Sequence, residues 1–346
     1  MTQHFVGIDL HKSVVQVCVM DDQGEVVREK RLSVDTSEDA EQVLAFLAGW
    51  KDRARFVVEA LGMNRWFVNA CRAAGLEIVI ADPCKLGLKA LGKKTDRRDA
   101  RELARRLRLG DIERFALTYY PSDEEYGQRK LIRTRHRLVQ IRQQLVNQIR
   151  GLLNAYRIRP PFSVLFNKGA RAWLHACALP VEELTHCLQA LAATLDGAQQ
   201  QIEVLNKRVH ALGNEKAALQ LQEHLPSVGP QTALTLLCEL GDVTRFHSRR
   251  AIASYAGLVP RVSQSAEKSH HGRLTKRGSR ELRWILSQWA VRLLARNPLV
   301  QAWARPRLKR THRNKVRLAL ARRLLIGVSI MLTRGEVFSL ERCLGA

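Results

Sequence analysis

The chain has 346 residues and a formal net charge of +24, from 57 Lys and Arg against 33 Asp and Glu. A length above about 250–300 residues predicts several domains, and so large a positive charge predicts a polyanionic partner, nucleic acid above all. The chain has no run of about 18 or more apolar residues and no signal-peptide pattern at its start, which argues against a membrane or exported protein and favours a cytoplasmic one. The seven cysteines form no CxxC pair, so neither a zinc site nor a disulfide framework is expected.

The first third of the chain has the pattern of a mixed α/β domain, which we place at residues 1–120. Apolar and polar side chains alternate over residues 5–32, which predicts three antiparallel strands. Thr36 is predicted to cap a helix, and two buried parallel strands are predicted at 55–59 and 77–81 with a second helix between them. The order βββαβαβα is that of a ribonuclease-H-like (RuvC-like) fold.

Four acids of this domain are candidates for one site: Asp9, Glu59, Asp96 and Asp99. Asp9 lies within the first strand, where a solitary acid is costly unless it is paired or bound to a metal. Glu59 ends the fourth strand, which lies beside the first in this topology, and Asp96 and Asp99 are spaced so that both project from one helix face. We therefore expect the four carboxylates to converge on one edge of the sheet. The alternative is that the two acids of the helix form ordinary salt bridges with its arginines, Arg97, Arg98 and Arg101.

Converging carboxylates repel one another and stay ionised only with a cation between them, and oxygen-only ligands select Mg²⁺ or Mn²⁺. Two such ions about 3.5–4 Å apart can hold a scissile phosphate and stabilise the entering and leaving oxygens of an in-line displacement. The four acids are therefore the predicted catalytic and metal-binding residues. Lys93 and Lys94 either contact the substrate phosphate or belong to a solvated basic face.

A helical middle part follows, which we place at residues 121–222. The pattern is helical from about 124 to 156 and is stopped by Pro160. From 184 to 212 apolar residues recur at alternating steps of 4 and 3, which is the a/d seam of a coiled coil. Two interpretations stay open: an antiparallel helical hairpin that spaces two domains, or a coiled coil that pairs subunits.

The last part, residues 223–346, is predicted to be mainly α-helical and carries most of the positive charge. Between Arg245 and Arg323 there are 21 Lys and Arg against two acids. A turn at Gly229 precedes an apolar helix and resembles a helix-hairpin-helix element, and a simple turn fits equally well. One basic amphipathic helix is predicted from 291 to 325, which either follows a nucleic-acid groove or covers the core.

Several motifs of the chain resemble those of one family. Gly-Ile-Asp-Leu-His-Lys around Asp9, Glu-Ala-Leu-Gly at Glu59 and Lys-Thr-Asp-Arg-Arg-Asp-Ala at 94–100 are similar to motifs of the DEDD transposases of bacterial insertion sequences, a group that includes the pilin-gene invertases. Downstream, Leu-Pro-Ser-Val-Gly-Pro, Glu-Leu-Gly-Asp-Val-Thr-Arg-Phe, Tyr-Ala-Gly-Leu-Val-Pro and Leu-Thr-Lys-Arg-Gly-Ser-Arg-Glu-Leu-Arg resemble, in this order, the C-terminal transposase domain of that family. The resemblance covers nearly the whole chain and implies a DNA recombinase or transposase.

The resemblance also implies a covalent step, in which a serine after a Gly-Leu-x-Pro segment attacks the DNA phosphate while the carboxylate-bound metal supports the displacement. Ser265, read as part of a loop, fits this role best, and Ser263 and Ser269 are the competing choices. A serine hydroxyl is a weak nucleophile unless a base or a metal activates it, so a pairing with the distant acids gives Ser265 a physical rationale. Ala266 stands where the family has glycine, which permits backbone angles that alanine resists.

Basic residues around this serine are predicted to neutralise backbone phosphates and to make binding steeply salt-dependent. Together with Lys93 and Lys94, the candidate nucleic-acid-binding residues are Lys268, Arg273, Lys276, Arg277, Arg280 and Arg283. By resemblance, the protein excises and inserts its own element at a target chosen by a noncoding bridge RNA, and it works as a dimer or tetramer whose active sites combine acids and serine from different subunits. The expected partners are therefore DNA, a guide RNA and further copies of the chain.

Two other hypotheses are compatible with the same residues. In a metal-dependent nuclease of the junction-resolvase kind, water attacks the phosphate and Ser265 is incidental. In a non-catalytic nucleic-acid-binding scaffold, the acids serve no reaction, so substitution of Asp9 or Asp96 leaves every activity unchanged. A covalent protein–DNA adduct would separate the recombinase from both.

Overall fold

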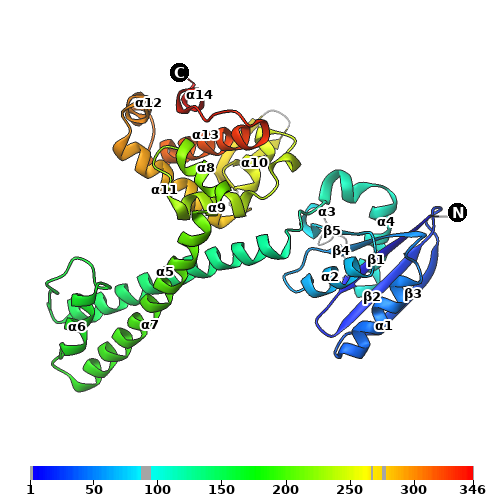
Figure 1. Ribbon diagram of the computed structural model, residues 1–346, viewed down its shortest axis with the longest axis horizontal. Coiled ribbons are helices and arrows are strands. Elements are labelled where there is room, and N and C mark those ends of the chain that lie inside the picture. The colour runs from blue at the N-terminus through cyan, green and yellow to red at the C-terminus, as the bar shows by residue number, and fades with distance from the viewer. Residues whose placement is uncertain (1–2, 87–94, 266–267, 275–277, 346) are drawn as a thin grey trace. The chain divides into compact units, whose positions relative to one another are not determined.

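The computed structural model describes residues 3–86, 95–265, 268–274 and 278–345. The chain divides into two compact units, residues 1–120 and 121–346, which are described in turn (Figure 1). None of the helices within the described ranges combines the length and the apolar character that a bilayer span requires.

The first unit is built on a five-stranded mixed sheet. Its strands are β1 (His4–Leu10), β2 (Val14–Met20), β3 (Val26–Ser33), β4 (Ala54–Glu59) and β5 (Ile78–Ala81). The order across the sheet is β3-β2-β1-β4-β5. β1, β2 and β3 are antiparallel neighbours, whereas β1, β4 and β5 run parallel. The five strands predicted from the sequence, and their senses, are confirmed.

Helices cover both faces of this sheet. They are α1 (Ser37–Ala48), α2 (Arg65–Ala73), the short α3 (Pro83–Leu86), α4 (Asp96–Arg108) and the π-helical turn η2 (Ile112–Ala116). α1 and α2 pack on one face and α4 on the other. α1 begins at the predicted cap: the Thr36 hydroxyl accepts from the backbone N–H of Asp39, and the Asp39 carboxylate accepts from that of Thr36.

The alternation of β1 between the two faces determines where its acid lies. Val6 and Ile8 are buried in the apolar cluster under α1 and α2, so Gly7 and Asp9 face α4. α4 approaches β1 closely at Gly7, where a Cβ would lie 2.0 Å from the backbone oxygen of Ala100. The glycine therefore sets the distance at which the first turns of α4 pass the sheet.

The second unit begins with two long helices. Its first elements are α5 (Asp123–Ala155), α6 (Lys168–Ala176), α7 (Glu182–Gly213) and α8 (Lys216–His224). α5 and α7 lie side by side in Figure 1 and share a buried cluster that includes Leu145 and Ile149 of α5 and Leu188 and Leu195 of α7. Part of the predicted a/d seam is therefore buried within the chain, in a helical hairpin. Pairing of subunits through these helices stays a prediction.

The rest of the second unit is a helical bundle with a two-stranded hairpin. Its elements are α9 (Pro230–Leu240), η3 (Val243–Arg245), α10 (Arg249–Tyr255), β6 (Pro260–Ser265), β7 (Lys268–Leu274), α11 (Arg280–Arg296), α12 (Pro298–Leu308), α13 (Arg313–Arg334) and α14 (Leu340–Leu344). The single helix predicted from 291 to 325 is wrong. Asn297 ends α11 and caps α12, and Pro298 occupies the first position of α12, where it supports a new helix but not the continuation of an old one.

A buried carboxylate ties the start of α11 to the long helix α5. Glu239 on α9 is fully buried, and Arg133 of α5 donates to its two oxygens at 2.8 and 2.9 Å. Ser279, which caps α11, donates to the same carboxylate at 2.8 Å. Tyr255 of α10 donates to the Glu239 carbonyl at 2.9 Å. The network joins four helices next to the point where the chain leaves the β6–β7 hairpin.

Candidate active site

Two of the predicted acids lie at neighbouring strand ends. Asp9, in β1, is 3% exposed, and Glu59, the last residue of β4, is 7% exposed. The parallel pairing of β1 with β4 puts Ile8 opposite Val58. The next residues along the two strands are Asp9 and Glu59, so both acids lie at the same edge of the sheet.

The other two predicted acids lie in the first turn of α4. This helix begins at Asp96, after Thr95, whose hydroxyl accepts from the backbone N–H of Arg98 at 3.3 Å. Asp99 is buried, and Asp96 is partly exposed. The N-terminal end of a helix carries a partial positive charge, so both carboxylates are at an electrostatically favourable position.

Glu29 of β3 fixes α4 in this position. Arg97 donates to it at 2.6 Å, and Arg101 donates to it through Nη2 at 2.9 Å. The hydrogen bonds from Arg101 and Arg97 lower the pKa of Glu29 to about 2. Both of these arginines, which the alternative interpretation paired with the acids of α4, therefore bind a carboxylate of the sheet.

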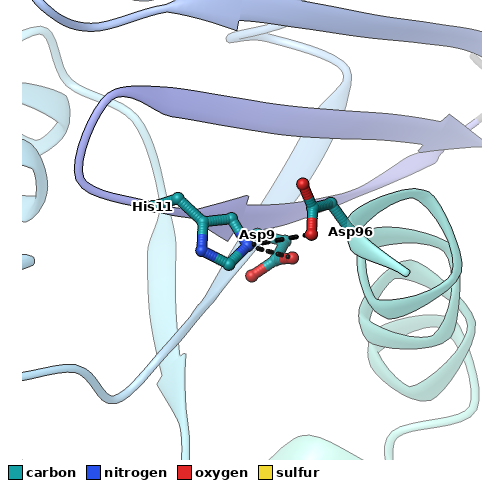
Figure 2. Close-up of side chains that lie close together, drawn as sticks. All are labelled: Asp9, His11 and Asp96. Atoms are coloured by element: carbon teal, nitrogen blue, oxygen red, sulfur yellow. Dashed lines mark hydrogen bonds and ion pairs between the residues drawn. The ribbon is translucent and has the colours of Figure 1, made fainter. Parts of the chain in front are cut away.

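His11 lies among these acids, and sequence reasoning assigned it no role. Its Nε2 atom lies 3.1 Å from Asp9 Oδ2 and 3.2 Å from Asp96 Oδ1. Figure 2 shows the ring pointing toward both carboxylates. The three atoms all lie within 4.8 Å of one another. A signal was present in the sequence, because His11 follows Asp9 by two residues, the spacing that returns a side chain to the same face of a strand.

Electrostatics connect Asp9 to both acids of α4. Burial raises the pKa of Asp9 above its ordinary value, His11 opposes this shift, and the charges of Asp99 and Asp96 add to it. Asp99 therefore acts on Asp9 electrostatically. Among the described residues, however, the group of three whose ligand atoms all lie within 4.8 Å of one another is Asp9, His11 and Asp96, without Asp99. Glu59 lies outside that cluster as well. Its strand end is held by Asn64, whose side chain donates to the Glu59 carbonyl at 2.7 Å.

The donor set fits a divalent cation. The four predicted acids offer carboxylate oxygens, which are the ligands that hard divalent cations prefer. Burial of Asp9 penalises its ionised form, and a bound cation offsets such a penalty. A cation held here would supply positive charge to the oxygens of a phosphate group.

The predicted nucleophile belongs to a strand, not to a loop. β6 and β7 form an antiparallel hairpin in which Ser265, the last residue of β6, pairs with Lys268, the first residue of β7. Ser263 lies two residues earlier in β6, and Ser269 lies in β7. Ala266 lies outside the described residues. The backbone thus places Ser265 at the connected end of the hairpin.

The predicted phosphate contacts lie partly on this hairpin and partly on the helix after it. Lys268 and Arg273 belong to β7. Arg280 is exposed at the start of α11, whereas Arg283 donates to the carbonyl of Ala256 at 3.2 Å and so also serves the fold. The remaining four fall outside the described residues: Lys93, Lys94, Lys276 and Arg277.

A basic groove opens at the foot of the hairpin. Its volume is about 980 Å³, and Pro260 and Leu274, where the hairpin begins and ends, form part of its wall together with α13. Glu336 is the acid that lines this groove. Its carboxylate oxygens lie 3.3 Å from Arg334 Nη1 and 3.4 Å from Arg342 Nη1. The cations that line the groove are Arg249, Lys315, Arg322, Arg323, Arg334 and Arg342. The groove therefore keeps a net positive charge, which suits a phosphate backbone.

Two family profiles match the chain. The profile of the Transposase IS116/IS110/IS902 family matches residues 219–321, and that of the DEDD transposase domain of IS110 elements matches residues 6–158. The second range contains all four predicted acids, and the first contains Ser265. The region with the four acids and the region with Ser265 are thus each similar to a domain of transposases.

Curated relatives align over most of the chain. It is 25% identical over 345 residues to the transposase for insertion sequence element IS1111A of Coxiella burnetii, which covers 96% of this chain and 90% of that protein. It is 26% identical over 328 residues to a probable family 20 transposase of Pseudomonas aeruginosa, which covers 91% and 93%. It is 29% identical over 223 residues to the transposase for insertion sequence element IS1328 of Yersinia enterocolitica. The two profiles together span most of the chain, and the first two of these relatives align over more than 90% of it. The chain is therefore a transposase of the IS110/IS116/IS902 family, a DNA-processing enzyme.

Proposed function

We propose that the chain excises and inserts a mobile element by metal-dependent cleavage and exchange of DNA strands, through a covalent serine–DNA intermediate. The observation that carries this proposal is the carboxylate edge of the first unit, where Asp9 is buried beside His11 and Asp96 and within the electrostatic reach of Asp99. The basic β6–β7 hairpin, whose first strand ends at Ser265, supplies the second part of the machinery.

In this proposal the first unit is a ribonuclease-H-like catalytic domain. The strand order β3-β2-β1-β4-β5, with three antiparallel strands followed by parallel ones, supports this assignment. The residues that hold the divalent cation, Mg²⁺ or Mn²⁺, are Asp9, Glu59, Asp96 and Asp99. When bound, the cation supplies positive charge to the scissile phosphate and to the departing oxygen. Gly7 and Glu29 position α4, and with it two of these acids.

Ser265 supplies the attacking oxygen. Its Oγ forms a bond to the phosphorus of the scissile phosphate, the bond from phosphorus to a deoxyribose oxygen breaks, the serine proton passes to solvent and the departing oxygen takes up a proton. A deoxyribose hydroxyl of another strand then attacks the phosphoserine ester, restores a phosphodiester and releases Ser265. Ester bonds are exchanged one for one, so strand exchange needs no separate source of energy.

The second unit holds the nucleic acids. The exposed Arg280 and the cations of the groove offer contacts to DNA and to a noncoding bridge RNA that selects the target. Helices α5 and α7 pair subunits into a dimer or tetramer, so that one subunit brings its acids to the serine of another. The family resemblance and the positive charge of residues 223–346 support the RNA partner.

A trapped adduct tests the proposal. The full-length protein is incubated with DNA that carries the element's ends, with RNA transcribed from the flanking noncoding segment and with Mg²⁺ or Mn²⁺. Protein bound covalently to cleaved DNA is then sought on denaturing gels and mapped by mass spectrometry. We expect an adduct on Ser265 that Ser265→Ala abolishes and that Ser263→Ala and Ser269→Ala retain.

Other outcomes of this experiment would overturn the proposal. Cleavage without an adduct, undiminished in Ser265→Ala, would show a nuclease in which water attacks. An adduct on Ser263 or Ser269 would reassign the nucleophile. Activities that Asp9→Ala and Asp96→Ala leave unchanged would show a nucleic-acid-binding scaffold.

A further inference from the structure

His11 is held against the carboxylate edge by the backbone as well as by its ring. It follows β1 directly, and its backbone N–H donates to the Val14 carbonyl at 2.8 Å, which closes the turn into β2. Its side chain is 42% exposed, in contrast to the 4% of the Asp9 side chain beneath it. The imidazole therefore lies at the solvent side of the site, across from the buried acid.

The ring contacts two acids through one atom. Nε2 lies 3.1 Å from Asp9 Oδ2 and 3.2 Å from Asp96 Oδ1 (Figure 2). A single N–H aligns well with only one acceptor, so a hydrogen bond alone satisfies one of these two oxygens at most. A cation among the three atoms would satisfy all of them.

The separations agree with ligands that share one ion. Ligands at right angles around an octahedral ion, with bonds of about 2.1 Å, lie about 3.0 Å apart, and ligands on opposite sides lie about 4.2 Å apart. The contacts of Nε2 at 3.1 and 3.2 Å match the first spacing. The carboxylate oxygens of Asp9 and Asp96 lie within 4.8 Å of each other, a limit that includes both spacings.

We propose that His11 is a ligand of the cation that Asp9 and Asp96 hold, and that it binds through Nε2. This inference rests on the proposed function, since it adds a nitrogen donor to the carboxylate metal site. Imidazole is a good ligand for transition metals, whereas Mg²⁺ prefers oxygen donors. His11 therefore makes the site selective for Mn²⁺ over Mg²⁺.

Electron spin resonance of Mn²⁺ bound to the full-length protein tests this assignment directly. With ¹⁴N-histidine the pulsed spectrum is expected to show nitrogen coupling to the bound ion, and with ¹⁵N-histidine the coupling frequency is expected to change. His11→Gln, which keeps an oxygen donor and removes the imidazole, is expected to abolish the coupling while Mn²⁺ remains bound.

His175 provides a matched control in the second unit. Its side chain is 43% exposed, and its Nε2 lies 2.6 Å from Asp196 Oδ2, so it is a histidine–aspartate pair like that of His11 outside the candidate site. His175→Gln is expected to leave the nitrogen coupling and the affinity for Mn²⁺ unchanged. His11→Ala is expected to lower the affinity for Mn²⁺ by about 10–100-fold and that for Mg²⁺ by less, as measured by calorimetry.

The possible failures are distinguishable. Bound Mn²⁺ that requires Asp9 but shows no nitrogen coupling would overturn the role of His11 and leave the proposed function intact. An unchanged or increased affinity for Mn²⁺ in His11→Ala would also overturn it, because His11 would then compete with the cation. If the wild-type protein binds no Mn²⁺, or binds Mn²⁺ equally well after Asp9→Asn, both the role of His11 and the metal-dependent function on which it rests would be overturned.

Discussion

The carboxylate edge of the first unit and the basic groove of the second differ in the sign of their charge and in its exposure to solvent. At the edge, the charge of Asp9 is buried, and close packing at Gly7 and the pairing of Glu29 hold its neighbours in place. In the groove, six cations surround a volume of about 980 Å³ that is open to a ligand. The effect of a buried charge depends on its exact distance from neighbouring groups, whereas exposed charges attract a polyanion by their total number. Single substitutions should therefore have large effects at the edge and small effects in the groove.

The largest effect is expected from Asp9→Asn, which removes a carboxylate from the centre of the edge. Loss of a residue that supports a metal ligand already costs about 10–100-fold, so loss of this proposed ligand should lower DNA cleavage by more than about 100-fold. DNA binding should persist, because the basic surface is untouched. Gel assays of cleavage and binding, with the exposed Asp52→Asn as control, measure both. Near-normal cleavage in Asp9→Asn would show that single substitutions at the carboxylate edge do not have the large effects expected there.

The same variant is expected to stabilise the protein when no metal is added. Burial raises the pKa of Asp9 in the folded state, so the folded protein binds this proton more tightly than the unfolded chain does. The resulting stabilisation is present at low pH and is lost as the pH rises through the pKa of the folded state. At neutral pH the ionised carboxylate therefore destabilises the fold, and asparagine removes this cost. Thermal unfolding of both proteins near pH 7 and near pH 4 checks the sign. A lower melting temperature for Asp9→Asn at neutral pH would contradict it.

Gly7→Ala should have the next largest effect, because the new Cβ would meet backbone atoms of α4. It would lie 2.0 Å from the Ala100 oxygen and 2.5 Å from the Ala104 nitrogen, so the helix must move. Overpacking of this kind costs about 1–3 kcal/mol in the free energy of unfolding. Urea unfolding measures the loss, and Gly62→Ala, whose Cβ would meet nothing within 4 Å, is the control. Equal stability of the two variants would show that α4 is not held at this contact.

Glu29→Gln tests the anchor of α4 with a smaller effect. Its hydrogen bonds to Arg97 and Arg101 should contribute about 1–2 kcal/mol of stability at neutral pH. The pKa of Glu29 is lowered to about 2, so this contribution is present above its ordinary value of 4.5 and is lost as the pH falls through about 2. Urea unfolding across this range, with the exposed Glu25→Gln as control, should show a difference that shrinks with acid. A difference that does not depend on pH would refute the ion pair as its cause.

The smallest effect is expected in the groove. Arg322→Ala removes one of six cations and should weaken DNA binding by a few-fold, with a decrease of about 1 in the slope of log affinity against log salt. Arg313→Ala, on the same helix but not among the groove residues, is the matched control. Fluorescence anisotropy at several salt concentrations measures both. A loss of affinity of more than about 100-fold in Arg322→Ala would mean that this arginine makes a specific contact to DNA, and that it is not one of several equivalent charges.

The fold of the first unit was predictable because its signals are local. Alternation along β1 and the apolar runs of β4 and β5 reveal a strand by its own residues, and the cap at Thr36 reveals the start of α1. In the second unit the single tail helix was wrong because its periodicity outweighed the stop signal at Asn297 and Pro298. The sequence predicts a loop at Ser265, because β6 and β7 contain few apolar residues and so lack the alternation that indicates a half-buried strand.

The contacts of the site were less predictable than its acids. A carboxylate within a strand is conspicuous, so Asp9 stands out in the sequence. The pairing of Glu29 with Arg97 joins residues 68 positions apart, and no local pattern indicates it. The two-residue spacing from Asp9 is the only local indication of His11, and it is a weak one because His11 lies one residue beyond β1.

The central claim is that the acids of the first unit and Ser265 serve one strand-exchange reaction. The most direct measurement is the yield of protein–DNA adduct on Ser265, with metal and RNA present, in the wild-type chain and in Asp96→Asn at equal DNA occupancy. We predict a Ser265 adduct in the wild type and its loss in Asp96→Asn. An adduct of wild-type yield in Asp96→Asn, or strand exchange that persists in Ser265→Ala, would contradict the claim.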